Sequence, residues 1–150
     1  MRIMGLDLGN KTLGVAISDS LGMFATGYPT IRFKSKDFDT ALTEVLKLIE
    51  KEKVDEIVLG LPKNMDGSLG EQAQISLEFQ KKLEEASKIK VNMLDERLTS
   101  RIGLSQMIQG NENKKTRHDA IDEAAAKVIL QDYLDMKRGG KKWTTMREAI

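Results

Sequence analysis

Two short apolar segments open the chain and predict a β-hairpin. Residues 2–9 are mostly apolar and end in glycine, and residues 13–19 form a second apolar run. The polar residues between these segments are typical of a tight turn. Residues 23–33 predict a third strand, in which Pro29 favours an edge position because proline has no N–H to donate to a neighbouring strand. The chain is therefore expected to begin as a three-stranded meander.

From residue 37 onward the hydrophobic period becomes helical. Apolar residues at a spacing of three and four positions predict an amphipathic helix over 37–52, and a buried-type strand follows over 55–61. Ser68 and Glu71 match a capping box, which predicts a second helix that ends near residue 87. The middle of the chain thus alternates between helix and strand.

The last third of the chain continues this alternation. A short strand is expected over 91–94, a helix beginning at Thr99 and ending near residue 110, and a polar loop over 110–116. The strongest helical pattern runs over 117–136. Residues 1–136 are expected to form one α/β domain with a mixed sheet covered by helices, and residues 137–150 a basic C-terminal tail.

The composition restricts the chemistry that is available. The 150 residues carry 24 Lys and Arg against 23 Asp and Glu, so nucleic-acid binding would have to depend on local clusters of charge. Cysteine is absent and His118 is the only histidine, which excludes disulfides, thiolate sites and sites with several histidines. Carboxylates remain as metal ligands, and they suit hard cations such as Mg²⁺ or Mn²⁺.

No apolar run reaches the length of a membrane span, and Asp7 and Lys11 interrupt the first apolar stretch where a signal peptide would be continuous. A cytoplasmic protein without a membrane partner is the expectation.

Two acids occupy positions where burial of a charge needs an explanation. Asp7 ends an almost wholly apolar run, so it is expected to be paired, neutralised or bound to metal, or else to help turn the hairpin. On the predicted last helix, Asp122 shares a face with Ala126 and Ile129, which is a packing face. An acid on a packing face favours a metal site.

Two further positions leave alternatives open. Asp119 lies on the same side of the last helix as Asp122, but with Thr116 it also matches a capping box, which is the favoured interpretation. Asp95 and Glu96 follow a strand, where side chains alternate between faces, so one of them is expected to reach the site. The residues alone do not say which of the two it is.

Converging carboxylates of this kind are typical of phosphodiester cleavage. Two divalent ions about 4 Å apart can activate a water, stabilise the charge on the phosphate and assist the leaving oxygen. Neither a histidine nor a protein nucleophile is then required.

Taken together, five motifs resemble the YqgF (RuvX) family. They are 7-DLGNKTLGVAISD-19, 60-GLPKNMDGS-68, 95-DERLT-99, 121-IDEAAA-126 and 129-ILQDYL-134. The resemblance covers almost all of the chain up to Leu134 and leaves the basic tail outside.

This resemblance implies a three-layer ribonuclease H-like fold with a mixed five-stranded sheet and helices on both faces, similar to RuvC-type resolvases. It implies catalytic and metal-binding roles for Asp7, Glu96 and Asp122, with Asp119 as an additional metal ligand. The implied substrate is precursor 16S ribosomal RNA, processed at its 5′ end, with a ribosomal particle as a partner. Four-way DNA junctions are the alternative.

Several cations are expected to contact substrate phosphates. The loop that contains Lys63 leads to a helix N-terminus, which favours a phosphate. The other candidates flank the acidic motifs. They are Lys11, Arg97, Arg101, Lys114, Lys115 and Arg117.

Two rival functions are also compatible with parts of this sequence. The segment 7-DLGNKT-12 is similar to the phosphate-binding hairpin of actin-like ATPases, but 150 residues hold no second such domain. The domain could instead bind RNA without cutting it. A monomer is the expected state, with a dimer as the alternative.

Overall fold

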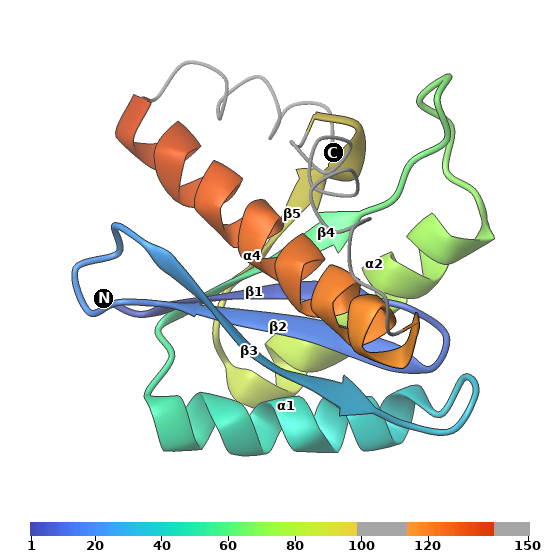
Figure 1. Ribbon diagram of the computed structural model, residues 1–150, viewed down its shortest axis with the longest axis horizontal. Coiled ribbons are helices and arrows are strands. Elements are labelled where there is room, and N and C mark those ends of the chain that lie inside the picture. The colour runs from blue at the N-terminus through green and yellow to red at the C-terminus, as the bar shows by residue number, and fades with distance from the viewer. Residues whose placement is uncertain (99–113, 140–150) are drawn as a thin grey trace.

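The computed structural model describes the backbone of residues 1–98 and 114–139 and the side chains of residues 1–97 and 123–139. Its elements, in chain order, are β1 (Ile3–Leu8), β2 (Thr12–Ser18), β3 (Ala25–Arg32), α1 (Phe38–Glu52), β4 (Glu56–Leu61), α2 (Glu71–Ser87), β5 (Val91–Asp95), the 3-10 helix η1 (Glu96–Leu98) and α4 (Lys114–Gly139). One five-stranded sheet lies between two helical layers (Figure 1).

The sheet has the strand order β3-β2-β1-β4-β5. Strands β1, β2 and β3 pair antiparallel as the predicted meander, whereas β4 and β5 continue from β1 in parallel. Pro29 lies in β3 at the edge of the sheet, as its missing N–H predicts. The expected mixed α/β sheet with helices on both faces is confirmed.

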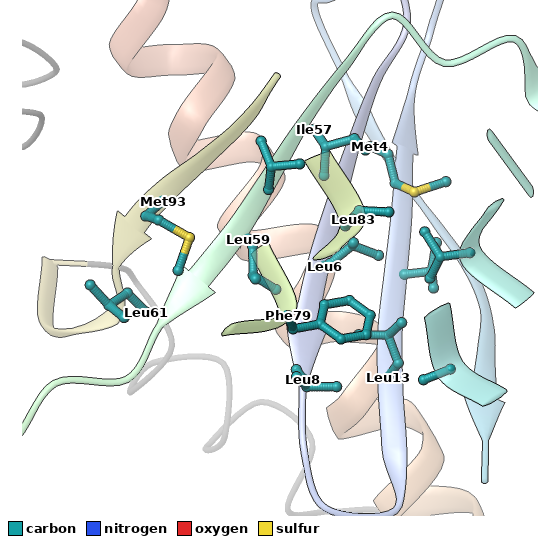
Figure 2. Close-up of a cluster of buried hydrophobic side chains, with 14 of the residues drawn as sticks. Met4, Leu6, Leu8, Leu13, Ile57, Leu59, Leu61, Phe79, Leu83 and Met93 are labelled. Atoms are coloured by element: carbon teal, nitrogen blue, oxygen red, sulfur yellow. The ribbon is translucent and has the colours of Figure 1, made fainter. Parts of the chain in front are cut away.

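Helices α1 and α2 cover one face of the sheet. Alternate residues of β1, among them Met4, Leu6 and Leu8, contribute to a buried cluster on this face together with Phe79 and Leu83 of α2. Figure 2 shows Met4, Leu6 and Leu8 of β1 on the side of the sheet from which Phe79 and Leu83 of α2 approach. This cluster is the larger of the two cores.

Helix α4 alone covers the opposite face among the described helices. Its buried residues Ala126, Ile129 and Leu130 pack with Ile3 of β1 and Val58 of β4. Gly5 brings the helix close to the sheet, because a Cβ at this position would lie only 2.6 Å from the Cβ of Leu130. The glycine is therefore required by the closeness of α4 to β1.

A polar cluster holds the C-terminal half of α4 in place. Asn92 donates a hydrogen bond of 2.9 Å to the hydroxyl of Tyr133, which in turn donates to Glu56 of β4. Lys137 completes the cluster with an ion pair of 3.0 Å to Glu56. These contacts place the last turns of α4 over the beginning of β4.

The two helices that cover this face begin differently. Asp37 caps α1 by accepting from the backbone N–H of Thr40, at the start of the helix that the period change predicted over 37–52. The capping box of Ser68 and Glu71 does not form, because the Ser68 hydroxyl donates to Asp66 inside the preceding loop. The N-cap of α2 is Gly70, which has no side chain to cap with.

The last helix is longer than its pattern predicted. It begins at Lys114, so Thr116 lies inside the helix and the predicted cap at Thr116 is wrong. It also continues to Gly139, because Lys137 finds a partner in Glu56, so the first three residues of the predicted tail are helical.

The helix predicted over 99–110 lies outside the described residues. In the part of the chain that is described, no helix has the length and apolar character that crossing a membrane requires.

The close approach at Gly5 gives a stability prediction. Gly5→Ala is expected to lower the free energy of unfolding by about 2 kcal/mol, because the new methyl group overlaps Leu130 and the helix must move. Urea unfolding measures the change. Gly139→Ala is the matched control, since no atom of the described residues lies within 4 Å of its Cβ position, and equal losses in both variants would contradict the packing argument.

Candidate active site

Asp7 lies on the sheet face that α4 covers. Side chains alternate along β1, and Gly5, two residues earlier, faces α4 while Leu6 and Leu8 belong to the opposite core. Asp7 is half-buried near the carboxyl end of the strand. The β1–β2 pairing sets Gly14 opposite Asp7, so no bulky cross-strand neighbour covers the carboxylate from that side.

Glu96 reaches the same face from the end of β5. A Cβ on Gly60 would lie 3.0 Å from both Cδ and Oε2 of Glu96, and 2.8 Å from Cδ1 of Ile129. The Oε1 atom of Glu96 is buried. The carboxylate of Glu96 is therefore held above Gly60 in β4, in a space that exists because Gly60 has no side chain.

The strand register brings the two acids together. Leu6 pairs with Leu59 in the parallel β1–β4 ladder, so Asp7 is level with Gly60 on the next strand. Neighbouring strands are about 4.8 Å apart, so the Glu96 carboxylate lies over the strand next to that of Asp7. Both acids lie at the carboxyl ends of parallel strands, where open α/β sheets bind their ligands.

The path of α4 brings the turn containing Asp122 to the same end of the sheet. Tyr133 contacts Glu56, which is level with the start of β1, and Ala126 lies beside Gly5 farther along that strand. The helix therefore runs backward over β1. Asp122, one turn before Ala126, follows in the direction of Asp7.

Asp95 lies on the other face of the sheet and is already paired. Its side chain is only 1% exposed and accepts from the Arg97 guanidinium at 2.7 Å and from the Arg97 backbone N–H at 3.0 Å. Burial raises the pKa of Asp95, but the side-chain and backbone hydrogen bonds from Arg97, with the charges of Arg97 and Lys63, lower it further than burial raises it. Of the two open alternatives, Glu96 is the one on the face of Asp7.

The predicted cations are distributed unevenly. Lys11 is exposed at the β1–β2 turn, and Lys63 is half-buried after β4. Arg97 bonds Asp95 and also donates to the Met65 carbonyl at 3.4 Å, so it ties the loop after β4 to the end of β5. Its contact with substrate stays a prediction.

The remaining predicted site residues are described only in part. Arg101 lies outside the described residues. Five others lie in α4, where the structure describes their backbone alone. They are Lys114, Lys115, Arg117, Asp119 and Asp122.

The described acids alone do not complete a metal site. Among the side chains that the structure describes, no three Asp, Glu or His residues lie close enough to hold an ion by themselves. Asp7 and Glu96 nevertheless offer oxygen ligands at one place, and the absent Cβ of Gly60 leaves room for one of them. These donors fit Mg²⁺ or Mn²⁺, which bind carboxylate oxygens.

Sequence reasoning missed the role of Gly60. A glycine inside a strand of apolar residues signals close approach of another group, and that signal was present in 56-EIVLGL-61. It does not say which group approaches.

Comparison with known proteins identifies the family. A family model described as "RuvX: Holliday junction resolvase" matches residues 1–136. The chain belongs to the RuvX family. Two Clostridium botulinum relatives, both named "Putative pre-16S rRNA nuclease", are 47% (strain Hall) and 46% (strain Eklund 17B) identical over 135 residues, which are 90% of this chain and 97% of each relative.

Solved structures agree on the fold of this RuvX-family chain. Thermus thermophilus RuvC in complex with a Holliday junction substrate superposes with a TM-score of 0.60 at 12% identity, covering 93% of this chain and 96% of that one. The fowlpox virus Holliday junction resolvase gives a TM-score of 0.56 at 16% identity. The match covers 90% of this chain and 99% of the resolvase chain. The expected ribonuclease H-like fold and the resemblance drawn from the five motifs are confirmed.

The Asp95–Arg97 pair predicts a pH-dependent loss of stability. Asp95→Asn is expected to lower the free energy of unfolding by about 2 kcal/mol near pH 7, because a buried charge-assisted pair is weakened. Since the folded-state pKa of Asp95 lies below its ordinary value of 3.8, this contribution is full above pH 3.8 and disappears as the pH falls through the folded value.

Urea unfolding of wild type and Asp95→Asn between pH 7 and pH 2 measures this difference. Asp39→Asn, an exposed acid in the first turn of α1, is the control for simple loss of charge. If the difference in free energy of unfolding between wild type and Asp95→Asn stayed constant over the whole pH range, the charge of the Asp95 carboxylate would not be the source of its stabilising effect on the fold.

Proposed function

We propose that this protein is a metal-dependent nuclease that hydrolyses phosphodiester bonds in precursor 16S ribosomal RNA during 5′-end processing. The observation that carries the proposal is that Asp7 is level with Gly60 on the neighbouring strand, and that the Glu96 carboxylate lies over Gly60 on the same face, which α4 covers. Acids brought together at the carboxyl ends of β1 and β5 have no evident packing use. Carboxylates placed on one face near one another are ligands that favour a divalent cation.

Asp7, Glu96 and Asp122 would hold Mg²⁺ or Mn²⁺, with Asp119 as a further ligand one turn earlier on α4. When bound, such a cation lowers the pKa of a coordinated water and neutralises charge on the scissile phosphate. The chain contributes orientation: Gly60 and Ile129 confine the Glu96 carboxylate between the sheet and α4. A ligand confined in this way is oriented before substrate arrives.

Substrate phosphates would be bound by cations around this face. Lys11 on the β1–β2 turn and Lys63 after β4 are the described candidates. The others are Arg97, Arg101, Lys114, Lys115 and Arg117. Phosphate contacts of this type position a nucleic acid without reading its bases, so specificity would depend on substrate shape.

RNA is favoured as substrate because relatives 47% identical over nearly their full length carry the name of a pre-16S rRNA nuclease. A four-way DNA junction is the second candidate, favoured by the family description and by the shared fold with RuvC. We propose action in the cytoplasm on a ribosomal precursor particle, as a monomer. A third possibility is a processing factor that binds RNA without cleaving it.

The central experiment compares wild type, Asp7→Asn and Asp122→Asn on precursor rRNA and on a four-way DNA junction, with Mg²⁺ or Mn²⁺ and with a chelator. Both variants are expected to lose at least about 100-fold in cleavage rate while staying folded, because each removes a charge that holds the metal. Asp39→Asn on the opposite side of the sheet is the control and is expected to cleave normally.

Cleavage of one substrate and not the other decides between RNA and DNA. Unchanged cleavage in both acid variants would reject the site, and binding of precursor rRNA without cleavage by wild type would favour the non-catalytic factor.

A second prediction concerns the room that Gly60 provides. Gly60→Ala is expected to weaken Mn²⁺ binding and cleavage about tenfold or more, because the methyl group displaces the Glu96 carboxylate. The variant also loses stability through its contact with Ile129. Combining it with Ile129→Val, which removes Cδ1, is expected to recover stability in urea without recovering Mn²⁺ affinity in calorimetry. If stability and Mn²⁺ affinity both recovered, the packing against Ile129, and not the position of Glu96, would explain the loss of Mn²⁺ binding.

A further inference from the structure

Arg97, the second residue of η1, bonds back to Asp95 through its backbone as well as its side chain. Its backbone N–H donates to Oδ1 of Asp95 at 3.0 Å, while Nε and Nη2 of the guanidinium donate to the same carboxylate at 3.1 Å and 2.7 Å. Backbone and forked side-chain bonds to one carboxylate hold residues 95 and 97 in a single relative geometry. The residue between them is Glu96, an acid of the proposed site.

These bonds close on the face of the sheet opposite the Glu96 carboxylate. Asp95 pairs in register with Leu61, whose side chain belongs to the core under α1 and α2, and residues paired in this way share a face. Glu96 lies instead over Gly60, on the face of α4. Because the bonds of Arg97 fix the backbone on both sides of Glu96, they also fix the direction in which the Glu96 side chain leaves the backbone.

The loop between β4 and α2 is a compact unit that is closed by its own hydrogen bonds. The backbone N–H of Asn64 donates to the Ser68 carbonyl at 3.0 Å, and that of Gly67 donates to the Asn64 carbonyl at 2.8 Å. The Asp66 side chain accepts from the Ser68 backbone at 2.9 Å. Residues 64–68 therefore keep one shape, and a contact at one point of this loop positions all of it.

Arg97 is a point at which this loop rests on the end of β5. Nη1 of its guanidinium donates to the Met65 carbonyl at 3.4 Å. A Cβ on Gly67 would lie 3.4 Å from the same nitrogen, and the φ of +90° at Gly67 is one that residues with a side chain rarely adopt. Lys63, a predicted phosphate contact, lies near the start of this loop. Arg97 therefore joins that loop to the turn that carries Glu96.

We propose that Arg97 is a positioning residue of the nuclease site, whose bonds to Asp95 hold the Glu96 carboxylate in place for a divalent cation. The same guanidinium fixes the loop after β4 relative to β5. This role rests on the proposed metal-dependent function and is additional to a phosphate contact. A phosphate contact uses mainly the charge of Arg97, whereas positioning uses the fork of its guanidinium and its partner Asp95. The two roles therefore predict different results for the same variants.

The test measures Mn²⁺ affinity by calorimetry without nucleic acid, so that no phosphate contact contributes. Arg97→Gln is expected to bind Mn²⁺ about tenfold more weakly than wild type, because a carboxylate that is no longer held in place is a poorer ligand. Arg97→Lys keeps the positive charge but not the fork, and it is expected to lose nearly as much affinity. Unchanged Mn²⁺ affinity in both variants, together with weaker binding of RNA, would make Arg97 a substrate contact only and overturn the proposal.

Asp95→Asn separates the positioning role from the charge of Arg97, because the Asp95 side chain is 1% exposed and lies on the face away from Glu96. It is expected to lower Mn²⁺ affinity by a similar factor. The double variant with Asp95→Asn and Arg97→Gln is expected to lose no more than either single variant, since both substitutions act through one pair. Losses that multiply in the double variant would show that the two residues act independently and would overturn the proposal.

Arg2→Gln is the matched control for the loss of an ion pair. Arg2 pairs with Glu52 at 3.0 Å beside the beginning of β1, so this substitution removes a comparable pair at the end of the sheet away from Glu96. Its Mn²⁺ affinity is expected to equal that of wild type. If Arg2→Gln weakened Mn²⁺ binding as much as Arg97→Gln does, general loss of stability would explain both effects and the proposal would be wrong.

Hydrogen exchange gives a readout that does not depend on a metal. The amide of Gly67 is bonded to Asn64 inside the loop, and it is expected to exchange faster in Arg97→Gln than in wild type, because the loop loses a contact with the end of β5. Equal exchange rates at Gly67 in the two proteins would overturn the part of the proposal that concerns the loop.

The same titrations distinguish failure of the positioning role from failure of the proposed function. If wild type binds no Mn²⁺, the metal site is rejected and the positioning role with it. If wild type binds Mn²⁺ and cleaves, while both Arg97 variants keep the same Mn²⁺ affinity, only the positioning role is overturned.

Discussion

The packing of α4 directly against the backbone of β1 and β4 is the constraint on which the rest of this structure depends. Gly5 and Gly60 make it possible, since a methyl group at either position would come within 3 Å of a side chain of the helix. The contact forms one of the two cores and also sets the depth of the space between helix and sheet. That space is where the Glu96 carboxylate lies.

The direction of α4 follows from contacts at its far end. The cluster of Glu56, Asn92, Tyr133 and Lys137 anchors the last turns at the start of the parallel strands, and the helix then runs back toward their carboxyl ends. The anchoring contacts and the proposed site therefore lie at opposite ends of one helix. The polar groups at the anchored end pair with one another, whereas Asp7 and Glu96 at the other end lie on the face where we propose that a cation binds.

Two adjacent acids at the end of β5, Asp95 and Glu96, lie on opposite faces of the sheet and have different surroundings. Asp95 lies on the face of α1 and α2, where Arg97 compensates its charge and links the end of β5 to the loop after β4. Glu96, one residue later, lies on the face of α4 beside Asp7. Side-chain alternation predicted that they would separate, and the proposed metal site depends on this separation.

The sequence by itself determined which elements form, because strand and helix periods reflect local geometry and the burial of one face. The meander, the amphipathic α1 and the presence of α4 were all predicted from apolar spacing, and five motifs identified the family. Tertiary structure decided what depends on distant contacts: the N-cap at Gly70, the extension of α4 to Gly139, and the position of Glu96, and not Asp95, on the face of Asp7. These outcomes need the three-dimensional register of β1, β4 and α4, since no local pattern records which side chain occupies the space above Gly60.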